Sequence, residues 1–270
     1  MSIKPLKKFI YGTLPYACLR LFAPSSPKLP YYRFFHKHPY THFPYDFAQS
    51  YMTAAVEILT DTANGLPYVV HRGKKLYFPR TYPLRRIERL YRSLCLEQDT
   101  RYPHHYADHV QEYADRTLLD VGAAEGLIAL EAIGQVRHAY LFECDPDWQQ
   151  ALQATFRPWA EKTTIVPKYV GASSQGNTIS LDDFLQDKTA EKLFLKMDIE
   201  GAECDALAGA KTTFARAQDL QFAICTYHRK NDLRDISAFL DRFGCRYAPR
   251  SGYMYVNHRM RTALVRGHKG

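Results

Sequence analysis

Ionisable side chains follow four apolar runs of the sequence that could each form a strand. Asp120 stands at the end of the first run, and Glu143 follows the second. The third run is followed by Asp198 and Glu200, and the fourth by His228. Because ligands of an open α/β sheet bind beyond the carboxyl ends of its strands, we expect these five side chains to serve one site.

Three of these residues predict acid–base chemistry. His228 is the expected general base, because the unperturbed pKa of histidine is the nearest to neutral. Asp198 and Glu200 share one side of the strand end by two-residue alternation. Burying two acids without a task is costly, so we expect both to be catalytic. A surface histidine, or one paired with Glu200, is the alternative for His228.

The turn at residues 122–126 resembles a phosphate-binding loop but departs from the GxGxxG pattern of dinucleotide sites. Ala124 replaces the middle glycine, and Glu125 places a negative charge near the start of the next helix. That charge would repel a pyrophosphate at the helix N-terminus, whereas a cationic ligand such as S-adenosylmethionine would be accepted. Glu143 follows at the spacing of an acid that binds both ribose hydroxyls. A plain strand–helix connection is the alternative.

Apolar and polar residues alternate in strand and helix patterns from residue 116 onward. This alternation predicts a doubly wound, mostly parallel Rossmann-like α/β sheet. We expect strands at 117–121, 138–145, 192–200 and 220–228, and one or two short strands at 163–173. We expect helices at 126–134, 146–160, 201–217 and 232–244, and a turn at 180–185. The last two expected strands, 246–249 and 252–257, are separated by a short turn and predict an antiparallel hairpin at the sheet edge.

Residues 1–115 differ in composition from the rest, being rich in Tyr, Pro and His. We expect them to form an N-terminal α+β extension, followed by a separate domain at residues 116–270. Within the extension, the patterns predict a helix at 45–62, a hairpin at 65–80 and an amphipathic helix at 83–97.

Composition indicates a globular protein of the reducing cytoplasm. The six cysteines include no CxxC pair, so neither a zinc knuckle nor a redox motif is indicated. The net charge of +8 suits an anionic partner, although we do not expect nucleic acid. The basic, apolar N-terminus is interrupted by Pro15 and Arg20, which argues against a signal peptide or a membrane span. A helix packed on the protein and a peripheral membrane contact both remain open.

Roughly residues 116–256 resemble a class I S-adenosylmethionine-dependent methyltransferase, more narrowly the FkbM family. The most specific stretch is LKMDIEGAE at 195–203, which is similar to the family's fourth-strand signature. SLDDFL at 180–185 and YVGAS at 169–173, similar to the segment that borders the adenine, add to it. The resemblance implies an S-adenosylmethionine-dependent enzyme that methylates hydroxyl groups, often on sugars or secondary metabolites.

The resemblance also extends the expected site. The segment before the first strand commonly closes over cofactor and acceptor in this class, so His104, His105 and Tyr106 are expected lid residues, with a polar linker between two domains as the alternative. Glu203 is expected near the substrate, with helix capping as its alternative. The expected cofactor-binding residues are Asp120, Gly122, Ala123, Glu125, Gly126, Glu143, Cys144, Ala172, Ser173 and Asp198.

The expected acceptor is a hydroxyl of a sugar, a glycan or another small glycosylated metabolite. An RNA methyltransferase is the first alternative, but the Asn/Asp-Pro-Pro-aromatic motif expected after its fourth strand is missing. A non-catalytic cofactor-binding protein and a dehydrogenase are the others. Two or three acids and a histidine could hold Mg²⁺ or Mn²⁺, yet we predict no metal. The oligomeric state is left open.

Overall fold

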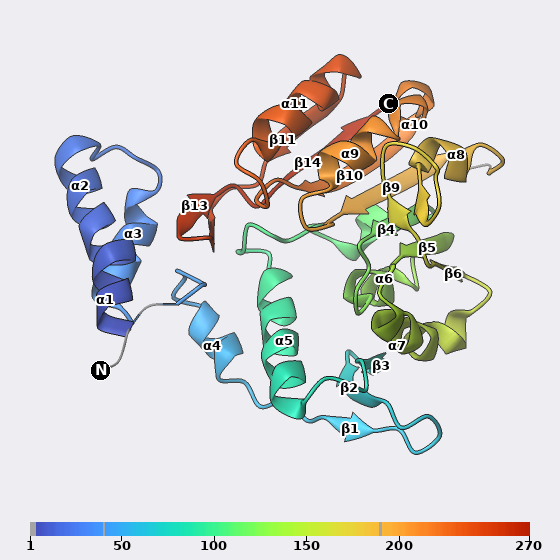
Figure 1. Ribbon diagram of the computed structural model, residues 1–270, viewed down its shortest axis with the longest axis horizontal. Helices are drawn as coiled ribbons and strands as arrows, with labels where there is room; N and C mark the ends of the chain where they lie inside the picture. The colour runs from blue at the N-terminus through green and yellow to red at the C-terminus, as the bar shows by residue number, and fades with distance from the viewer. Residues whose placement is uncertain (1–3, 40, 189–190) are drawn as a thin grey trace.

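The central feature of the computed structural model is a mixed sheet of seven strands, in the order β11-β14-β10-β9-β4-β5-β6 (Figure 1). The structure describes residues 4–39, 41–188 and 191–270. Strands β10, β9, β4, β5 and β6 run parallel, whereas β14 runs antiparallel to both β10 and β11. The strands are β4 (Thr117–Val121), β5 (His138–Phe142), β6 (Thr163–Val166), β9 (Lys192–Met197), β10 (Asp219–Cys225), β11 (Arg246–Pro249) and β14 (Leu264–Lys269).

Helices cover both faces of this sheet, because each central strand buries side chains on both sides. Leu118 and Phe194 pack into one hydrophobic cluster with the first set of helices. Leu119 and Leu195, their neighbours along the strands, pack into a second cluster on the other face. The first set is α5 (Leu84–Glu97), α6 (Leu127–Ala132) and α7 (Pro146–Phe156), and the second is α8 (Leu181–Leu185), α9 (Glu203–Ala208), α10 (Lys211–Arg216) and α11 (Asp232–Arg242). The predicted doubly wound fold is confirmed.

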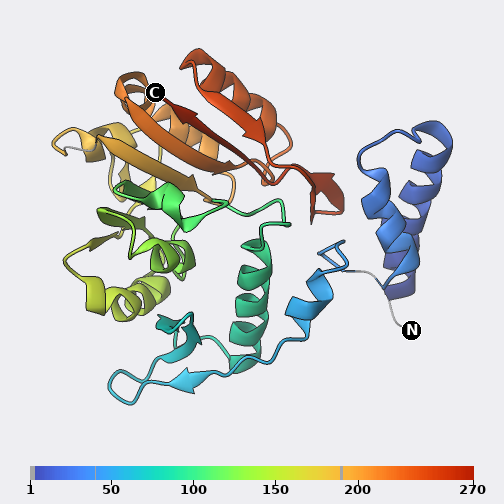
Figure 2. The ribbon, with the colours of Figure 1, turned by 180° about the vertical axis from the view of Figure 1, so that it is seen from behind.

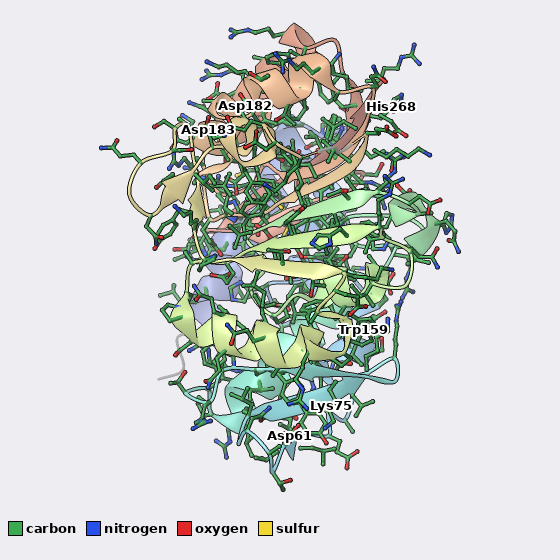
Figure 3. The ribbon with its side chains drawn as sticks, turned by 90° about the vertical axis from the view of Figure 1, so that its right-hand side faces the viewer. Asp61, Lys75, Trp159, Asp182, Asp183 and His268 are labelled. Atoms are coloured by element: carbon green, nitrogen blue, oxygen red, sulfur yellow. The ribbon has the colours of Figure 1, made fainter. Side chains whose placement is uncertain are left out.

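A small antiparallel sheet precedes α5. It consists of β1 (Leu59–Thr60), β2 (Pro67–His71) and β3 (Lys74–Tyr77), and the Lys75–Asp61 ion pair lies at its outer end (Figure 3). The predicted hairpin at 65–80 and helix at 83–97 are therefore confirmed.

The predicted helix at 45–62 is wrong over most of its length. Only α4 (Ala48–Met52) is helical. Val56 and Ile58 lie two residues apart, as in an extended chain, and both pack on the core. Leu59 and Thr60 then pair with β2, so tertiary packing overrides the local helical pattern.

Two further predictions need correction on the C-terminal side. The helix predicted at 201–217 is divided into α9 and α10 at Gly209, which packs so closely that a Cβ there would lie 2.1 Å from the carbonyl oxygen of Gly171. The predicted turn at 180–185 is a short helix, capped by the Ser180 hydroxyl.

The antiparallel edge is present, but it pairs β11 with β14. Residues 252–257, the predicted partner of β11, lie instead in a separate hairpin of β12 (Met254–Val256) and β13 (Arg259–Arg261). Strand β14, at the end of the chain, was not predicted, and it inserts between β10 and β11.

The first helices stand apart from the sheet, beside β13 (Figures 1 and 2). A nearly continuous helix is built from α1 (Lys4–Lys8), a π-helical turn (Phe9–Thr13) and α2 (Leu14–Phe22), and it is followed by α3 (Leu29–Lys37). In the part of the chain that the structure describes, no helix has the length and apolarity needed to cross a membrane.

Candidate active site

The turn between β4 and α6 adopts a left-handed backbone at the position of the missing glycine. Ala124 has φ +46°, a conformation that costs an L-residue roughly 1–2 kcal/mol. Gly122 has φ +80°, and a Cβ there would lie 2.0 Å from the Asp198 carbonyl oxygen. The Glu143 carboxylate accepts hydrogen bonds from the backbone N–H groups of Ala124 (2.9 Å) and Asp145 (2.8 Å). These two hydrogen bonds hold the turn against the residues that follow β5.

A buried lysine, which the sequence analysis missed, holds the other side of the turn. Lys196 Nζ lies 2.9 Å from Asp120 Oδ1 and donates a hydrogen bond of 2.6 Å to the Gly122 carbonyl oxygen. Burial opposes its charge, but Asp120 and Asp198 outweigh burial and raise the pKa of Lys196. The signal was available, because Lys196 is a charged residue inside an apolar strand.

Carboxyl groups dominate a cavity of about 90 Å³ between α5 and this turn. Glu97, Asp120, Glu125 and Asp198 line it, against the single amine of Lys196. Burial raises the pKa of Glu125 to about 7 and also raises that of Glu97. The cavity thus favours a cation, because binding one would relieve the cost of ionising these buried acids.

A second cavity, of about 440 Å³, shares Ala124 and Glu125 with the first. Tyr82, Arg86 and Trp148 contribute to its lining. Sites for ligands of drug size typically measure roughly 300–1,000 Å³. The smaller cavity therefore suits one end of such a ligand, and the larger one lies within this size range by itself.

Asp198 contacts several polar side chains at the centre of the site. Tyr106 donates a hydrogen bond of 2.7 Å to Asp198 Oδ2, and Tyr227 donates one of 3.2 Å to Oδ1. His104 Nε2 lies 3.4 Å from Oδ2. Burial opposes ionisation, but His104, Lys196 and His228 outweigh it and hold the pKa of Asp198 well below its usual range. Asp198 is therefore an ionised acceptor that orders the surrounding side chains.

His228 lies between three carboxylates. Its Nδ1 is 2.9 Å from Glu203 Oε1, and its Nε2 is 3.4 Å from Asp198 Oδ1 and 3.5 Å from Glu200 Oε2. Burial lowers the pKa of His228, but Glu203, Asp198 and Glu200 together outweigh burial and raise it. The imidazole is thus held in place and made more basic.

Glu203 and Glu200 differ from expectation. The side chain of Glu203 is fully buried and accepts a hydrogen bond of 2.9 Å from the Ile199 N–H, so it faces the backbone and His228 rather than space open to a substrate. The Glu200 side chain is 92% exposed. The premise that Glu200 is buried is wrong, since a left-handed backbone (φ +55°) turns the chain at this residue.

The remaining predicted residues are divided between the site and its surroundings. His104 and Tyr106 are buried against Asp198, whereas His105 Nδ1 lies 3.7 Å from Asp108 Oδ1. Five predicted cofactor-binding residues line neither cavity: Gly126, Glu143, Cys144, Ala172 and Ser173. The last two are exposed after β7 (Tyr169–Val170). Their contact with a cofactor stays a prediction.

Among the residues that the structure describes, two groups of side chains have metal-ligand chemistry. His104, Asp198 and Cys225 form one, and Asp198, Glu203 and His228 form the other, with ligand atoms within 4.8 Å of one another in each. Sequence reasoning missed Cys225, whose Sγ lies 3.4 Å from His104 Nε2, because an apolar strand gives no sign of which face a thiol takes.

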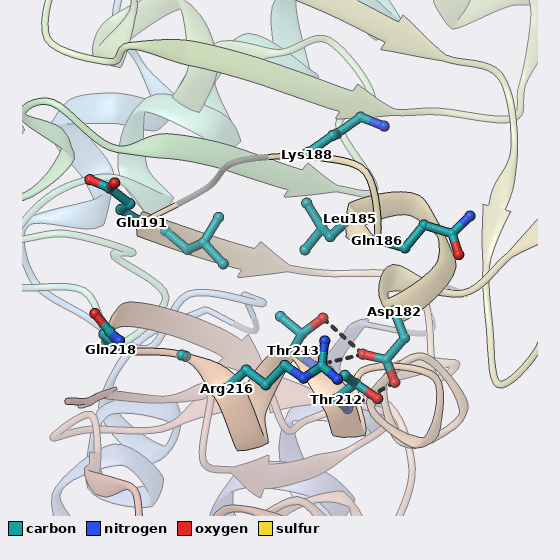
Figure 4. Close-up of a pocket in the computed structure, with 11 residues that line it drawn as sticks. Asp182, Leu185, Gln186, Lys188, Glu191, Thr212, Thr213, Arg216 and Gln218 are labelled. Carbon is teal, nitrogen blue, oxygen red and sulfur yellow. Dashed lines mark hydrogen bonds between the residues drawn. The ribbon is translucent and has the colours of Figure 1, made fainter.

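A cavity of about 460 Å³ between α8 and α10 holds none of the predicted residues (Figure 4). The carboxylate of Asp182 points into it, but its oxygens already accept hydrogen bonds from the protein. Asp182 accepts hydrogen bonds from the N–H groups of Thr212 (2.9 Å) and Thr213 (2.7 Å) at the start of α10. This acid caps a helix, and the candidate site remains at the carboxyl ends of the strands.

The sheet order and the acid-rich site at its carboxyl edge define an α/β protein of the class I methyltransferase type. Residues 78–247, more than half of the chain, match the family model described as the methyltransferase FkbM domain. The chain belongs to the FkbM methyltransferase family. The match begins ahead of residue 116, and the domain boundary predicted there stays a prediction.

Solved structures with a similar arrangement include methyltransferase FkbM from Methylobacillus flagellatus KT, at 21% identity and a TM-score of 0.47. That alignment covers 67% of this chain and 54% of the other, so this chain spans about half of its length. Magnesium protoporphyrin IX methyltransferase from Synechocystis PCC 6803, with bound SAM, is similar at 14% identity and a TM-score of 0.40, over 58% of this chain and 72% of the other. A comparison with curated proteins finds no match.

Proposed function

We propose that this chain is an S-adenosylmethionine-dependent O-methyltransferase that acts on a hydroxyl of a sugar, a glycan or a glycosylated metabolite. The observation that carries the proposal is His228, held by the buried Glu203 at the strand end that also presents Asp198 to the acid-lined cavity. A base and a cation-selective cavity are the two elements that methyl transfer from a sulfonium to an alcohol requires.

The residues present fit the proposed cofactor. Glu97, Asp120 and Glu125 offer carboxylates to its sulfonium and amino groups, and the same carboxylates would repel a pyrophosphate. Glu143 stands at the end of β5, where an acid can accept the ribose hydroxyls. When bound, S-adenosylmethionine supplies an activated methyl group for in-line displacement.

His228 is proposed to remove the proton of the acceptor hydroxyl as the oxygen–carbon bond forms and the sulfur–carbon bond breaks. Its Nδ1 faces Glu203, which leaves Nε2 as the nitrogen that takes the proton. Asp198 and Glu203 then stabilise the imidazolium. A positioned base contributes about 10²- to 10⁴-fold, and alignment with exclusion of water supplies the rest.

The test combines binding with a search for the acceptor. Calorimetric titration with S-adenosylmethionine and with NAD should give binding of the first alone; tight NAD binding alone would overturn the proposal. The protein is then incubated with methyl-labelled cofactor and fractionated glycans, lipids and RNA. Label in a glycan fraction supports the proposal. Label confined to RNA favours an RNA methyltransferase, and cofactor binding without label in any fraction favours a non-catalytic protein.

A further inference from the structure

The first helices carry a concentration of exposed apolar side chains. Among the described residues, ten large apolar side chains are exposed, and six of them lie between residues 6 and 22. Their exposed fractions run from 41% to 85%, and they are Leu6, Phe9, Ile10, Leu14, Leu21 and Phe22. Soluble monomers rarely expose large apolar patches without a function, so this helix predicts a partner.

The opposite side of the same helix is already occupied. A Cβ at Gly12 would lie 2.8 Å from Phe35 Cβ, so helix α3 packs directly on its backbone. Phe35 is fully buried against Tyr255 of the β12–β13 hairpin, and Tyr11 stacks on His258 at 3.8 Å. The helix is therefore fixed to the protein by one side, and the exposed apolar side chains lie outside that contact.

The charge of this region has one sign. Residues 1–45 contain seven Lys and Arg and no Asp or Glu. The other 225 residues contain 29 Lys and Arg against 28 Asp and Glu. Nearly all of the +8 net charge therefore belongs to the first helices and the loop after them.

The positive surface continues toward the candidate active site. A cavity of about 330 Å³ is lined by Lys28 and by four further cations, with no carboxyl group in its lining. These four are Arg229, Lys230, Arg259 and Arg261. Arg261 donates hydrogen bonds to the carbonyl oxygens of Tyr227 (2.9 Å) and His228 (3.3 Å). The cavity thus joins the helices to the strand end that carries the proposed base.

We propose that helices α1 and α2 dock on an anionic lipid bilayer, with the exposed apolar side chains inserted at the interface and the cations against lipid phosphates. Apolar side chains beside lysines are the composition of helices that lie in a membrane surface, and anionic lipid attracts each added cation. RNA would account for the cations but not for the exposed leucines and phenylalanines. This docking concerns a surface rather than the methyl transfer, so each can fail without the other.

The first experiment is flotation of the full chain with phosphatidylcholine vesicles that contain about 30% phosphatidylglycerol, without cofactor or acceptor. Binding is expected there, and at least about tenfold less to pure phosphatidylcholine. Raising the salt from about 0.1 M to about 0.5 M should weaken binding several-fold, because lipid charge is screened. Failure to float with anionic vesicles overturns the proposal, and so does equal binding to both vesicles.

Variants locate the contact. Leu21→Asp/Phe22→Asp should lower the partition coefficient at least about tenfold, since two apolar side chains no longer insert. Leu84→Asp is the matched control, because Leu84 is as exposed as Leu6 (59% each) but lies on α5. Lys7→Glu/Lys8→Glu should also weaken binding, whereas Lys192→Glu/Lys211→Glu, an equal change of charge elsewhere, should not.

Three results would overturn the proposal. Equal losses in the control variants would show that binding does not use the helices. Co-sedimentation with RNA but not with vesicles would assign the cations to nucleic acid. A dimer in sedimentation equilibrium that Leu21→Asp/Phe22→Asp dissociates would make a second copy the occupant of the apolar side.

Discussion

The acid-lined cavity and the N-terminal helices use charge in opposite ways. In the cavity, buried groups meet specific partners: Lys196 with Asp120, and His228 with Glu203. On the helices, exposed lysines have no carboxylate of residues 1–45 beside them and lie among exposed apolar side chains. Low local dielectric makes each buried partner matter individually, whereas exposed charges act by their sum. Single substitutions of charged residues should therefore affect the cavity strongly and the helices weakly.

The largest expected effect tests the cavity side of this comparison. His228→Ala should lower turnover about 10²- to 10⁴-fold and leave cofactor affinity unchanged, because the ring takes a proton and does not line the cofactor cavity. Single-turnover kinetics and calorimetry measure the two effects. The control is His138→Ala at the amino end of β5, the end of the strand away from the site. It should change neither turnover nor cofactor affinity. Unchanged turnover in His228→Ala excludes this residue as the base.

The next prediction concerns whether loosening the N-terminal helices changes the acid-lined cavity. Phe35→Ala removes the buried ring that packs against Tyr255, at a local cost of about 3–5 kcal/mol. Limited proteolysis should then cleave the first helices faster, while cofactor affinity stays the same. Phe22→Ala removes the same atoms from a ring that is 85% exposed and should not speed cleavage. A fall in cofactor affinity with Phe35→Ala would show that the regions are coupled.

Glu143→Ala examines one partner of the cofactor turn. Loss of its two backbone hydrogen bonds, and of the proposed ribose contact, should weaken cofactor binding by roughly 1–3 kcal/mol. Calorimetric titration gives the value, with Glu161→Ala on the exposed loop before β6 as the control. An affinity equal to that of the unaltered protein would remove Glu143 from the site.

Glu125 should make cofactor affinity depend on pH. Its carboxyl group has a pKa of about 7, so it is neutral below and negative above that pH. The dissociation constant of the cationic cofactor should therefore fall between pH 6 and pH 8, by about tenfold at most. Glu125→Gln should flatten the profile, and Glu57→Gln, an exposed control, should retain it. An identical profile in Glu125→Gln would assign the titration to another group.

The same shift has a consequence for stability. The folded-state pKa of Glu125 lies above the ordinary value of 4.5, so the stability that the neutral form contributes is present below pH 4.5 and lost as pH rises to 7. Glu125→Gln should therefore raise the free energy of unfolding at pH 8 by on the order of 1–3 kcal/mol, as measured by urea unfolding.

The smallest effect concerns the strained turn. Ala124→Gly should stabilise the protein by up to roughly 1 kcal/mol, because glycine adopts φ +46° without the steric cost. Ala129→Gly, in the middle of α6, should instead destabilise it by roughly 0.5–1 kcal/mol. Thermal unfolding measures both, and a destabilised Ala124→Gly would mean that the methyl group packs usefully.

Much of the fold could be predicted, because buried parallel strands and amphipathic helices have periodic patterns. Strand β4 and helix α5 were predicted in this way. The failures lie where a long-range contact decides. Gly209, where α9 ends, has no room for a Cβ beside the Gly171 carbonyl oxygen, and β14 pairs with residues at least 16 positions away in the sequence. Neither contact leaves a local pattern in the sequence.

In the candidate site, too, residues with a local sequence pattern could be predicted and long-range contacts could not. Asp198 and His228 could be named because each follows an apolar strand, and His104 and Tyr106 because they precede the first one. Their mutual distances were not predictable, and neither was the exposure of Glu200, which a left-handed backbone turns outward.

The sequence by itself determined which ionisable residues follow the apolar strands, which turn lacks its glycine, and where the positive charge is concentrated. Each depends only on residue type and order along the chain. The tertiary structure alone decided that Lys196 neutralises Asp120, that Glu203 holds His228, and that one side of the first helix is covered while apolar side chains elsewhere on it stay exposed. The physical reason is that burial and pairing of charges arise from segments that meet only when the sheet is assembled.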